Sequence, residues 1–213
     1  MLKNIISQLT GNSNLPQFDP SVLQDPLALK TAWTPLAGGG SNFKTAELHA
    51  VNEQRMEFRA SLGMKLMAAV FLIMGLVLAA VFISKQPQTL KDYIPVAMGV
   101  IFATIGAGML YSAITPTVFD LSHGYFCRSR KKPELMMDPS KLKTYAPLNR
   151  VHALQIIKEY IKTKKSAYYS YELNLVLDDG SRVHVIDHGN HLALLTDAQT
   201  LSQFLKKPLW NAS

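Results

Sequence analysis

The chain has 213 residues, of which 48% are hydrophobic and 17% are charged, a composition that fits a small membrane protein better than a large membrane-embedded machine. Its formal net charge of +7 favours attraction to anionic lipid headgroups. Nucleic acid is not expected as a partner, because no motif combines aromatic and basic residues. The single cysteine, Cys127, excludes an internal disulfide.

Residues 1–64 are expected to form a largely irregular cytoplasmic segment. The first nine residues place apolar side chains on one helical face, which fits either an interfacial or docking helix or a frayed terminus. Prolines then prevent long helices. Trp33 and Phe43 are large apolar residues in this polar stretch and are predicted to contact another surface. Residues 51–59 fit either an extension of the following helix or a short strand that joins a later sheet.

Two apolar segments predict a transmembrane helical hairpin over residues 65–115. Residues 66–83 are uninterrupted apolar sequence, and residues 93–114 carry no charge. A bilayer core roughly 30 Å thick needs about 20 helical residues to cross it, and both segments meet this once tilt is allowed. Buried helices of a soluble core are the alternative, but neither segment keeps the polar stripe of a soluble helix.

Small residues recur at helical spacing within these spans, where they let helix backbones approach closely. Two interpretations remain open, namely packing of the two spans on each other or packing against another subunit. The residues predicted to make this contact are Gly75, Ala79, Gly99, Ala103 and Ala107.

Basic residues predict the orientation of the hairpin. They gather before the first span and after the second, whereas the loop between the spans offers only Lys85 and Lys91. Because lysine and arginine favour the cytoplasmic side of a span, both termini are predicted to be cytoplasmic.

Residues 116–213 are predicted to form a small antiparallel β domain. The expected strands are 118–121, 125–127, 153–161, 172–177 and 182–188. A tight hairpin turn is predicted at Asp179-Gly180. A capping box at residues 196–199 predicts the start of a C-terminal helix, which Pro208 ends. A series of strands followed by one closing helix is the element order of a pleckstrin-homology-like (PH-like) domain. Together with the helical hairpin, this predicts an α+β membrane protein.

A resemblance is carried by four stretches of sequence. They read WTPLAGGGSNF, FDLSHGYF, YELNLVLDDGSRVHVIDHGN and DAQTLSQFLKKPLW, and they are spread over most of the chain. The chain resembles uncharacterised bacterial two-span inner-membrane proteins with a cytoplasmic PH-like β domain. The resemblance implies a multi-pass protein of the bacterial inner (plasma) membrane, and it implies no reaction.

The histidines of the sequence VHVIDHGNH are candidate metal ligands by residue type. His184 and His188 share a face of a regular strand, and Asp187 and His191 could add ligands from nearby. Strand residues four apart are separated by about 13 Å, however, which is too far for one ion. No metal ligand and no cofactor are therefore predicted.

No catalytic residue is predicted either. Asp120 and His123 could be an acid–base pair, but side chains that close a turn are the preferred interpretation. Cys127 is followed closely by Arg128 and Arg130. Their positive charges would lower the pKa of the Cys127 thiol if it were exposed. In an alternating strand an inward orientation fits it equally well.

Basic residues are the remaining candidates for contact with a membrane surface or a partner. They are Lys162, Lys164, Lys165, Arg128 and Arg130. The leading hypothesis is a non-enzymatic accessory, scaffold or assembly subunit that docks on a membrane protein complex or on further copies of itself. The alternatives are an anionic-lipid-binding membrane sensor and, less favoured, a metal-dependent or thiol enzyme.

Overall fold

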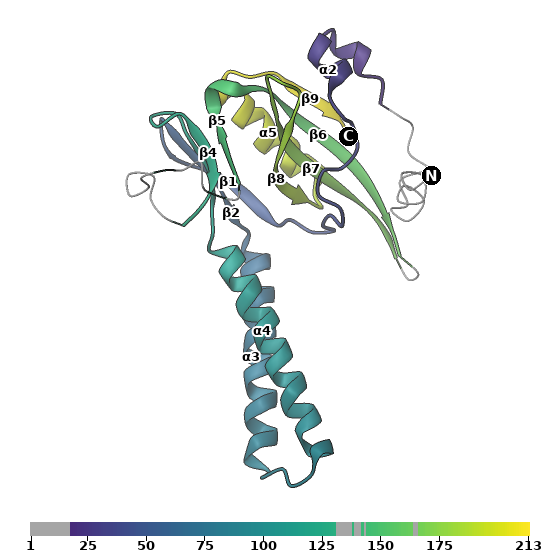
Figure 1. The fold of residues 1–213 in the computed structure, drawn as a ribbon, viewed down its shortest axis with the longest axis vertical. Coiled ribbons are helices and arrows are strands. Elements are labelled where there is room, and N and C mark those ends of the chain that lie inside the picture. The colour runs from purple at the N-terminus through teal and green to yellow at the C-terminus, as the bar shows by residue number, and fades with distance from the viewer. Residues whose placement is uncertain (1–17, 131–137, 139–141, 143, 164–165) are drawn as a thin grey trace. The chain divides into compact units, whose positions relative to one another are not determined.

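The computed structural model describes residues 18–130, 138, 142, 144–163 and 166–213. The chain divides into two compact units (Figure 1): one is Arg59–Pro116, and the other combines the chain up to Phe58 with Thr117–Ser213. This division differs from the expected boundaries at residues 64 and 116, because a strand before the first long helix pairs with a strand after the second. The described part of the N-terminal segment therefore belongs to the β domain.

The first sheet of the larger unit has its strands in sequential order. They are β1 (Ala46–Asn52), β2 (Arg55–Ala60), β3 (Thr117–Asp120), β4 (Tyr125–Arg128) and β5 (Tyr145–Pro147). Residues 51–59, for which two structures were possible, thus supply strands and not a helical extension. The expected hairpin of residues 118–127 is confirmed as β3 and β4, with Gly124 at a φ of 70° in its turn.

The second sheet has the strand order β8-β7-β6-β9. Its strands are β6 (Val151–Lys162), β7 (Ala167–Leu177), β8 (Arg182–His188) and β9 (Leu209–Ala212). The three predicted strands in this region are confirmed, and Gly180 has the positive φ, 80°, that the predicted turn requires. The short strand β9 runs parallel to β6; the sequence pattern did not indicate it, because so few residues after a proline carry no readable periodicity.

The C-terminal helix α5 spans His191–Leu205. Its predicted start at Thr196 is wrong, because the Asn190 side chain caps the helix earlier by accepting a hydrogen bond from the Ala193 amide. The Thr196 hydroxyl instead donates to the Leu192 carbonyl within the helix. Three short 3-10 or α segments complete the unit, and they are η2 (Pro20–Leu23), α2 (Pro26–Lys30) and η6 (Leu148–Arg150).

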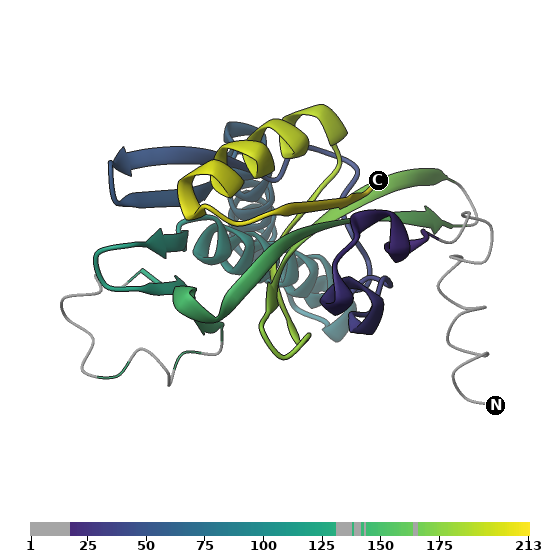
Figure 2. The same ribbon diagram turned by 90° about the horizontal axis from the view of Figure 1, so that it is seen from above.

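One hydrophobic core joins α5 to both sheets. It combines buried residues of the first sheet, the second sheet and the helix, among them Phe58, Phe119, Phe126, Leu154, Ile156, Leu173, Leu175, Leu194, Ala198 and Leu201. Side chains of a strand alternate between its two faces, so the residues between these core positions point away from α5. In Figure 2 the helix and residues 18–43 lie on opposite sides of the long strands.

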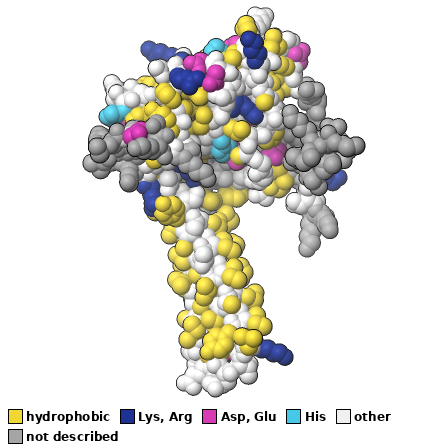
Figure 3. All heavy atoms as spheres, in the orientation of Figure 1, with side chains coloured by type: hydrophobic (Ala, Val, Ile, Leu, Met, Phe, Trp, Pro, Cys, Tyr) yellow, Lys and Arg dark blue, Asp and Glu magenta, His cyan; other side chains and the backbone are white. Residues whose placement is uncertain are grey.

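The smaller unit is a helical hairpin of α3 (Leu62–Ser84) and α4 (Ile94–Ala113), joined through η3 (Leu90–Tyr93). The Ser61 hydroxyl caps α3 by accepting a hydrogen bond from the Met64 amide. Both helices are long and apolar enough to span a membrane, which confirms the two apolar helices that the sequence predicts. Hydrophobic side chains cover most of the hairpin surface in Figure 3.

Candidate functional site

Polar side chains gather on the face of the second sheet that points away from α5. Glu159 lies on β6, Glu172 and Asn174 lie on β7, and Asp187 and His184 lie opposite these two β7 residues on β8. We call these five residues the polar cluster. Glu159, Glu172 and Asn174 are only 4%, 1% and 0% exposed. Burial of a carboxyl group is costly unless hydrogen bonds or opposite charges compensate it. The role of the cluster therefore depends on which hydrogen-bond partners these residues have.

A strap, residues 18–43, covers this polar face. The ring of Trp33 lies 5.9 Å from that of Trp210 on β9, and its indole N–H donates to the Ala28 carbonyl. The Phe43 carbonyl accepts a hydrogen bond from the Gly189 amide just after β8. Trp33 thus makes the side-chain contact predicted for it, and Phe43 is joined to the sheet through its backbone.

Polar contacts bind the strap along the sheet. Their partners on the sheet come from β6, β7 and β8, so the strap crosses several strands. The pairs are Asp25–His152, Ala32–Gln155, Thr34–Arg182 and Ser41–Ser170.

Glu172 holds the centre of the strap. Its carboxylate accepts hydrogen bonds from the backbone amides of Leu36, at 2.8 Å, and Ala37, at 2.7 Å. The Asn174 side-chain amide donates to the same carboxylate at 2.5 Å. Hydrogen bonds to an ionised acceptor are about twice as strong as neutral ones, so one buried side chain fixes two consecutive strap residues.

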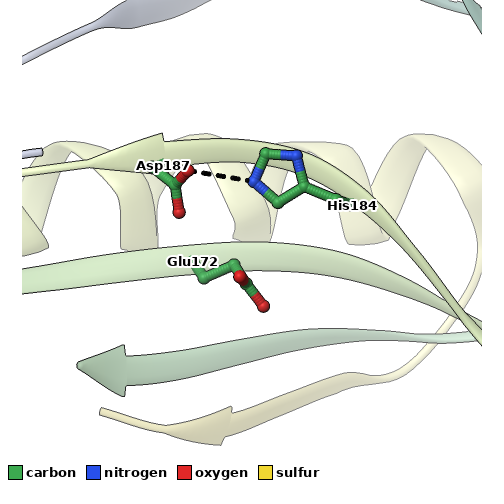
Figure 4. A group of neighbouring side chains, drawn as sticks. All are labelled: Glu172, His184 and Asp187. Atoms are coloured by element: carbon green, nitrogen blue, oxygen red, sulfur yellow. Dashed lines mark hydrogen bonds and ion pairs between the residues drawn. The ribbon is translucent and has the colours of Figure 1, made fainter. Parts of the chain in front are cut away.

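A β-bulge brings His184 into the cluster. Leu173 pairs with Ile186 while the next residue, Asn174, pairs with His184, which leaves one extra residue on β8. Residues three apart on a regular strand face opposite sides, but the extra residue turns His184 to the face of Asp187. Figure 4 shows both side chains above Glu172, with His184 Nε2 3.2 Å from Asp187 Oδ2.

The cluster contains more acceptors than donors. Within the described chain, Glu159 Oε2, Asn174 Oδ1 and Asp187 Oδ1 are buried and receive no hydrogen bond. Burial raises the pKa of Glu159, the Asp187 and Glu172 carboxylates raise it further, and a hydrogen bond from the Gly39 backbone opposes these effects. Each unsatisfied buried acceptor costs about 1–3 kcal/mol, so this site lacks positive charge or donors.

The three histidines near this strand have separate environments. His188 is fully buried, and burial lowers its pKa. His191 stacks on Tyr171 with ring centroids 4.6 Å apart. The pairing of His184 with His188 on one face is therefore wrong, because the bulge groups His184 with Asp187.

The small residues predicted to make a helix contact face one another inside the hairpin. A Cβ on Gly75 would collide with the Ala103 backbone. A Cβ on Gly99 would lie 2.6 Å from the Ala79 backbone nitrogen. Of the two interpretations, these residues show packing between α3 and α4.

The contact continues through Gly106 rather than through Ala107. A Cβ on Gly106 would collide with the Leu72 backbone, whereas Ala107 is exposed. Gly108, on the same helix, has no atom within 4 Å of an added Cβ. The stripe of small residues at strict four-residue spacing therefore drifts by one position at its C-terminal end.

The basic candidates that the structure describes lie on the surface. Lys162 at the end of β6 and Arg128 and Arg130 at the end of β4 are exposed, and the two groups belong to different sheets. Lys164 and Lys165 lie outside the described residues.

Two candidates for catalysis, Asp120 and Cys127, lie at the β3–β4 turn and in the buried part of β4. Asp120 accepts hydrogen bonds from the Ser122 hydroxyl, at 2.7 Å, and the His123 amide, at 2.9 Å, which closes the β3–β4 turn. The His123 ring also lies beside this carboxylate, with Nδ1 3.1 Å from Asp120 Oδ1, so the side chains of the pair do meet within the turn. Cys127 is buried, and burial raises the pKa of its thiol to about 11. A thiol protonated at neutral pH is a poor nucleophile.

Comparison of the chain with protein-family models, with curated proteins and with solved structures finds no match. The resemblance to two-span bacterial inner-membrane proteins thus stays a prediction, and function is inferred from the geometry alone.

Proposed function

We propose that this protein is a non-enzymatic accessory, scaffold or assembly subunit of a membrane protein complex. The α3–α4 hairpin anchors it in the bacterial inner membrane, and the larger unit serves as a cytoplasmic PH-like docking domain. The observation that carries this proposal is the sorting of side chains in the hairpin: glycine and alanine fill the contact between the helices, and large apolar side chains point outward.

The outward apolar surface supports the membrane anchor. Large side chains on several sides of the helices are more than half exposed, among them Leu66, Val70, Ile73, Val77 and Ile101. Soluble monomers rarely expose contiguous apolar patches larger than a few hundred Å², and each Å² of such surface costs about 25 cal/mol in water. A lipid bilayer removes this cost around the whole hairpin.

The element order of the larger unit supports a PH-like domain. Strands of two sheets precede α5, and the helix closes the core that the sheets share, while the short parallel strand β9 follows the helix.

Cysteine labelling tests the anchor and its orientation. Gln88→Cys lies in the loop between the helices and Glu53→Cys in the β1–β2 turn, and both positions are exposed. We expect an impermeant maleimide to label Gln88→Cys from the periplasmic side and Glu53→Cys only after the inner membrane is opened. The native Cys127, 1% exposed, gives a low background. Labelling of Gln88→Cys only after opening would contradict the two-span topology.

The particle mass after gentle solubilisation tests the docking role. We expect the full chain, extracted from its own cells in mild detergent, to elute in a particle heavier than a monomer with its detergent. A second candidate function, an anionic-lipid sensor, is favoured by the exposure of Lys162, Arg128 and Arg130. A monomeric particle that binds anionic but not neutral vesicles would replace the docking proposal with the sensor.

A further inference from the structure

The polar cluster has the donor set of a cation site. Glu172, His184 and Asp187 each offer one ligand atom, and these atoms lie within 4.8 Å of one another. Two ligands bound at about 2.0–2.2 Å to one ion lie about 3–3.5 Å apart at tetrahedral or octahedral angles. The 3.2 Å between His184 Nε2 and Asp187 Oδ2 is already such a separation (Figure 4).

A buried carboxylate beside these three residues points independently to a ligand. Glu159 is 4% exposed, interacts electrostatically with both Asp187 and Glu172, and leaves its Oε2 without a donor among the described residues. Asn174 is 0% exposed, lies against the Glu172 carboxylate, and leaves its Oδ1 without one too. Buried acceptors are normally satisfied, so this face of the sheet lacks positive charge or donors, and a cation bound beside Glu172 would supply that charge.

Arg182 compensates the carboxylates only in part. It interacts electrostatically with Glu172, but its guanidinium bonds to the Thr34 carbonyl, at 2.7 Å, and to the Gln155 side chain, at 3.3 Å. Among the described residues no ion pair joins it to a cluster carboxylate at salt-bridge distance. Glu172, His184 and Asp187 thus lie together in a buried to half-buried site without a cationic side chain in direct contact.

We infer that the polar cluster binds a divalent first-row transition cation, Mn²⁺ or Zn²⁺, through Glu172, His184 and Asp187. Carboxylates suit Mn²⁺ and imidazole suits Zn²⁺, so a mixed set fits these ions better than Mg²⁺ or Ca²⁺, which take oxygen ligands. Three donors already bind Glu172: the Leu36 amide lies 2.8 and 2.9 Å from its two oxygens, and the Ala37 and Asn174 amides each bind one of them. A carboxylate offers about four lone-pair sites, so one site is left for the ion.

The cation would join two strands beneath the strap. Glu172 comes from β7, His184 and Asp187 come from β8, and Glu172 also accepts hydrogen bonds from the strap amides of residues 36 and 37. The site is therefore structural in character, and binding is expected to stabilise the larger unit because only the folded state presents the assembled ligands.

Metal titration of the full chain tests this inference. The protein is prepared without a histidine tag, solubilised in detergent, stripped with a chelator and titrated with Mn²⁺, Zn²⁺, Mg²⁺ or Ca²⁺ alone. We expect stoichiometric uptake of one Mn²⁺ or Zn²⁺ and a rise in the unfolding temperature, with little response to Mg²⁺ and Ca²⁺. An absence of uptake, or a response to Mg²⁺ and Ca²⁺ only, would overturn the inference.

Two variants and a matched control locate the site. Asp187→Asn and His184→Gln should each weaken Mn²⁺ and Zn²⁺ binding at least about tenfold. His152→Gln removes another histidine–aspartate pair of the same unit, His152–Asp25, and should bind metal like the parent. Asp187→Asn should also keep the metal-free protein at least as stable, because it removes repulsion between carboxylates. Parent-like metal binding by Asp187→Asn and His184→Gln would place the ion elsewhere and refute the site.

Discussion

Replacing Gly99 by leucine is expected to destabilise the helical hairpin by about 1–3 kcal/mol, the usual cost of forcing atoms into a close-packed contact. A Cβ at Gly99 would lie 2.6 Å from the Ala79 nitrogen and 2.8 Å from the Gly75 carbonyl oxygen. Both are backbone atoms that cannot rotate away, so α3 and α4 must separate. Thermal unfolding of the detergent-solubilised full chain measures the effect.

Gly108→Leu is the matched control for this substitution. It lies on the same helix, but an added Cβ there meets no atom within 4 Å. Leucine should therefore bring only its better helix propensity, about 0.8–1 kcal/mol over glycine. Equal shifts of the unfolding temperature in both variants would show that the close approach at Gly99 carries no packing energy.

The hairpin was predictable because its signal is local and periodic. An uninterrupted apolar run of helical length and small residues one turn apart are visible in the sequence without any knowledge of distant contacts. The same holds for the β7–β8 turn, where the Asp179-Gly180 pair indicates a conformation that Gly180 does adopt. Even here the pattern failed by one position, since Gly106 and not Ala107 reaches the partner helix.

The polar cluster was not predictable from periodicity because a bulge changes it. Alternation along β8 places His184 with His188, whereas the extra residue before Ile186 places His184 with Asp187. Alternation along residues 172–177 places Glu172 on the more exposed face of its strand, yet Glu172 is 1% exposed and the strap amides of residues 36 and 37 bind it. No pattern within a strand predicts that a distant, proline-containing segment covers the face of the sheet that points away from α5.

The strap also explains why the observed domain boundaries differ from the expected ones. Its sequence reads as an irregular linker, yet its backbone groups contact side chains more than a hundred residues later, such as Glu172, Gln155 and Arg182. These contacts satisfy backbone amides and carbonyls that irregular segments otherwise leave to water. A segment without secondary structure can thus be an integral layer of a domain.

Replacing Glu172 by alanine is expected to release the strap and to destabilise the larger unit by about 2–5 kcal/mol. The substitution leaves the amides of Leu36, Ala37 and Asn174 without their acceptor in a site that is 1% exposed, and each unsatisfied buried donor costs about 1–3 kcal/mol. Trp33 should become more solvated, which shifts tryptophan fluorescence to the red, and proteases should cleave within residues 18–43. The measurements are made with a chelator present, so that loss of a bound cation does not contribute.

Asp178→Ala is the control, because it removes a carboxylate from the turn next to the same strand. Asp178 is 57% exposed and pairs with Arg150, and exposed ion pairs contribute little to stability. We therefore expect parent-like fluorescence, proteolysis and stability for Asp178→Ala. If Glu172→Ala behaves in the same way, the strap is held by its aromatic contact between Trp33 and Trp210 and not by the carboxylate. Release in Glu172→Ala alone would mean that one buried charge on β7 decides whether the N-terminal segment belongs to the domain.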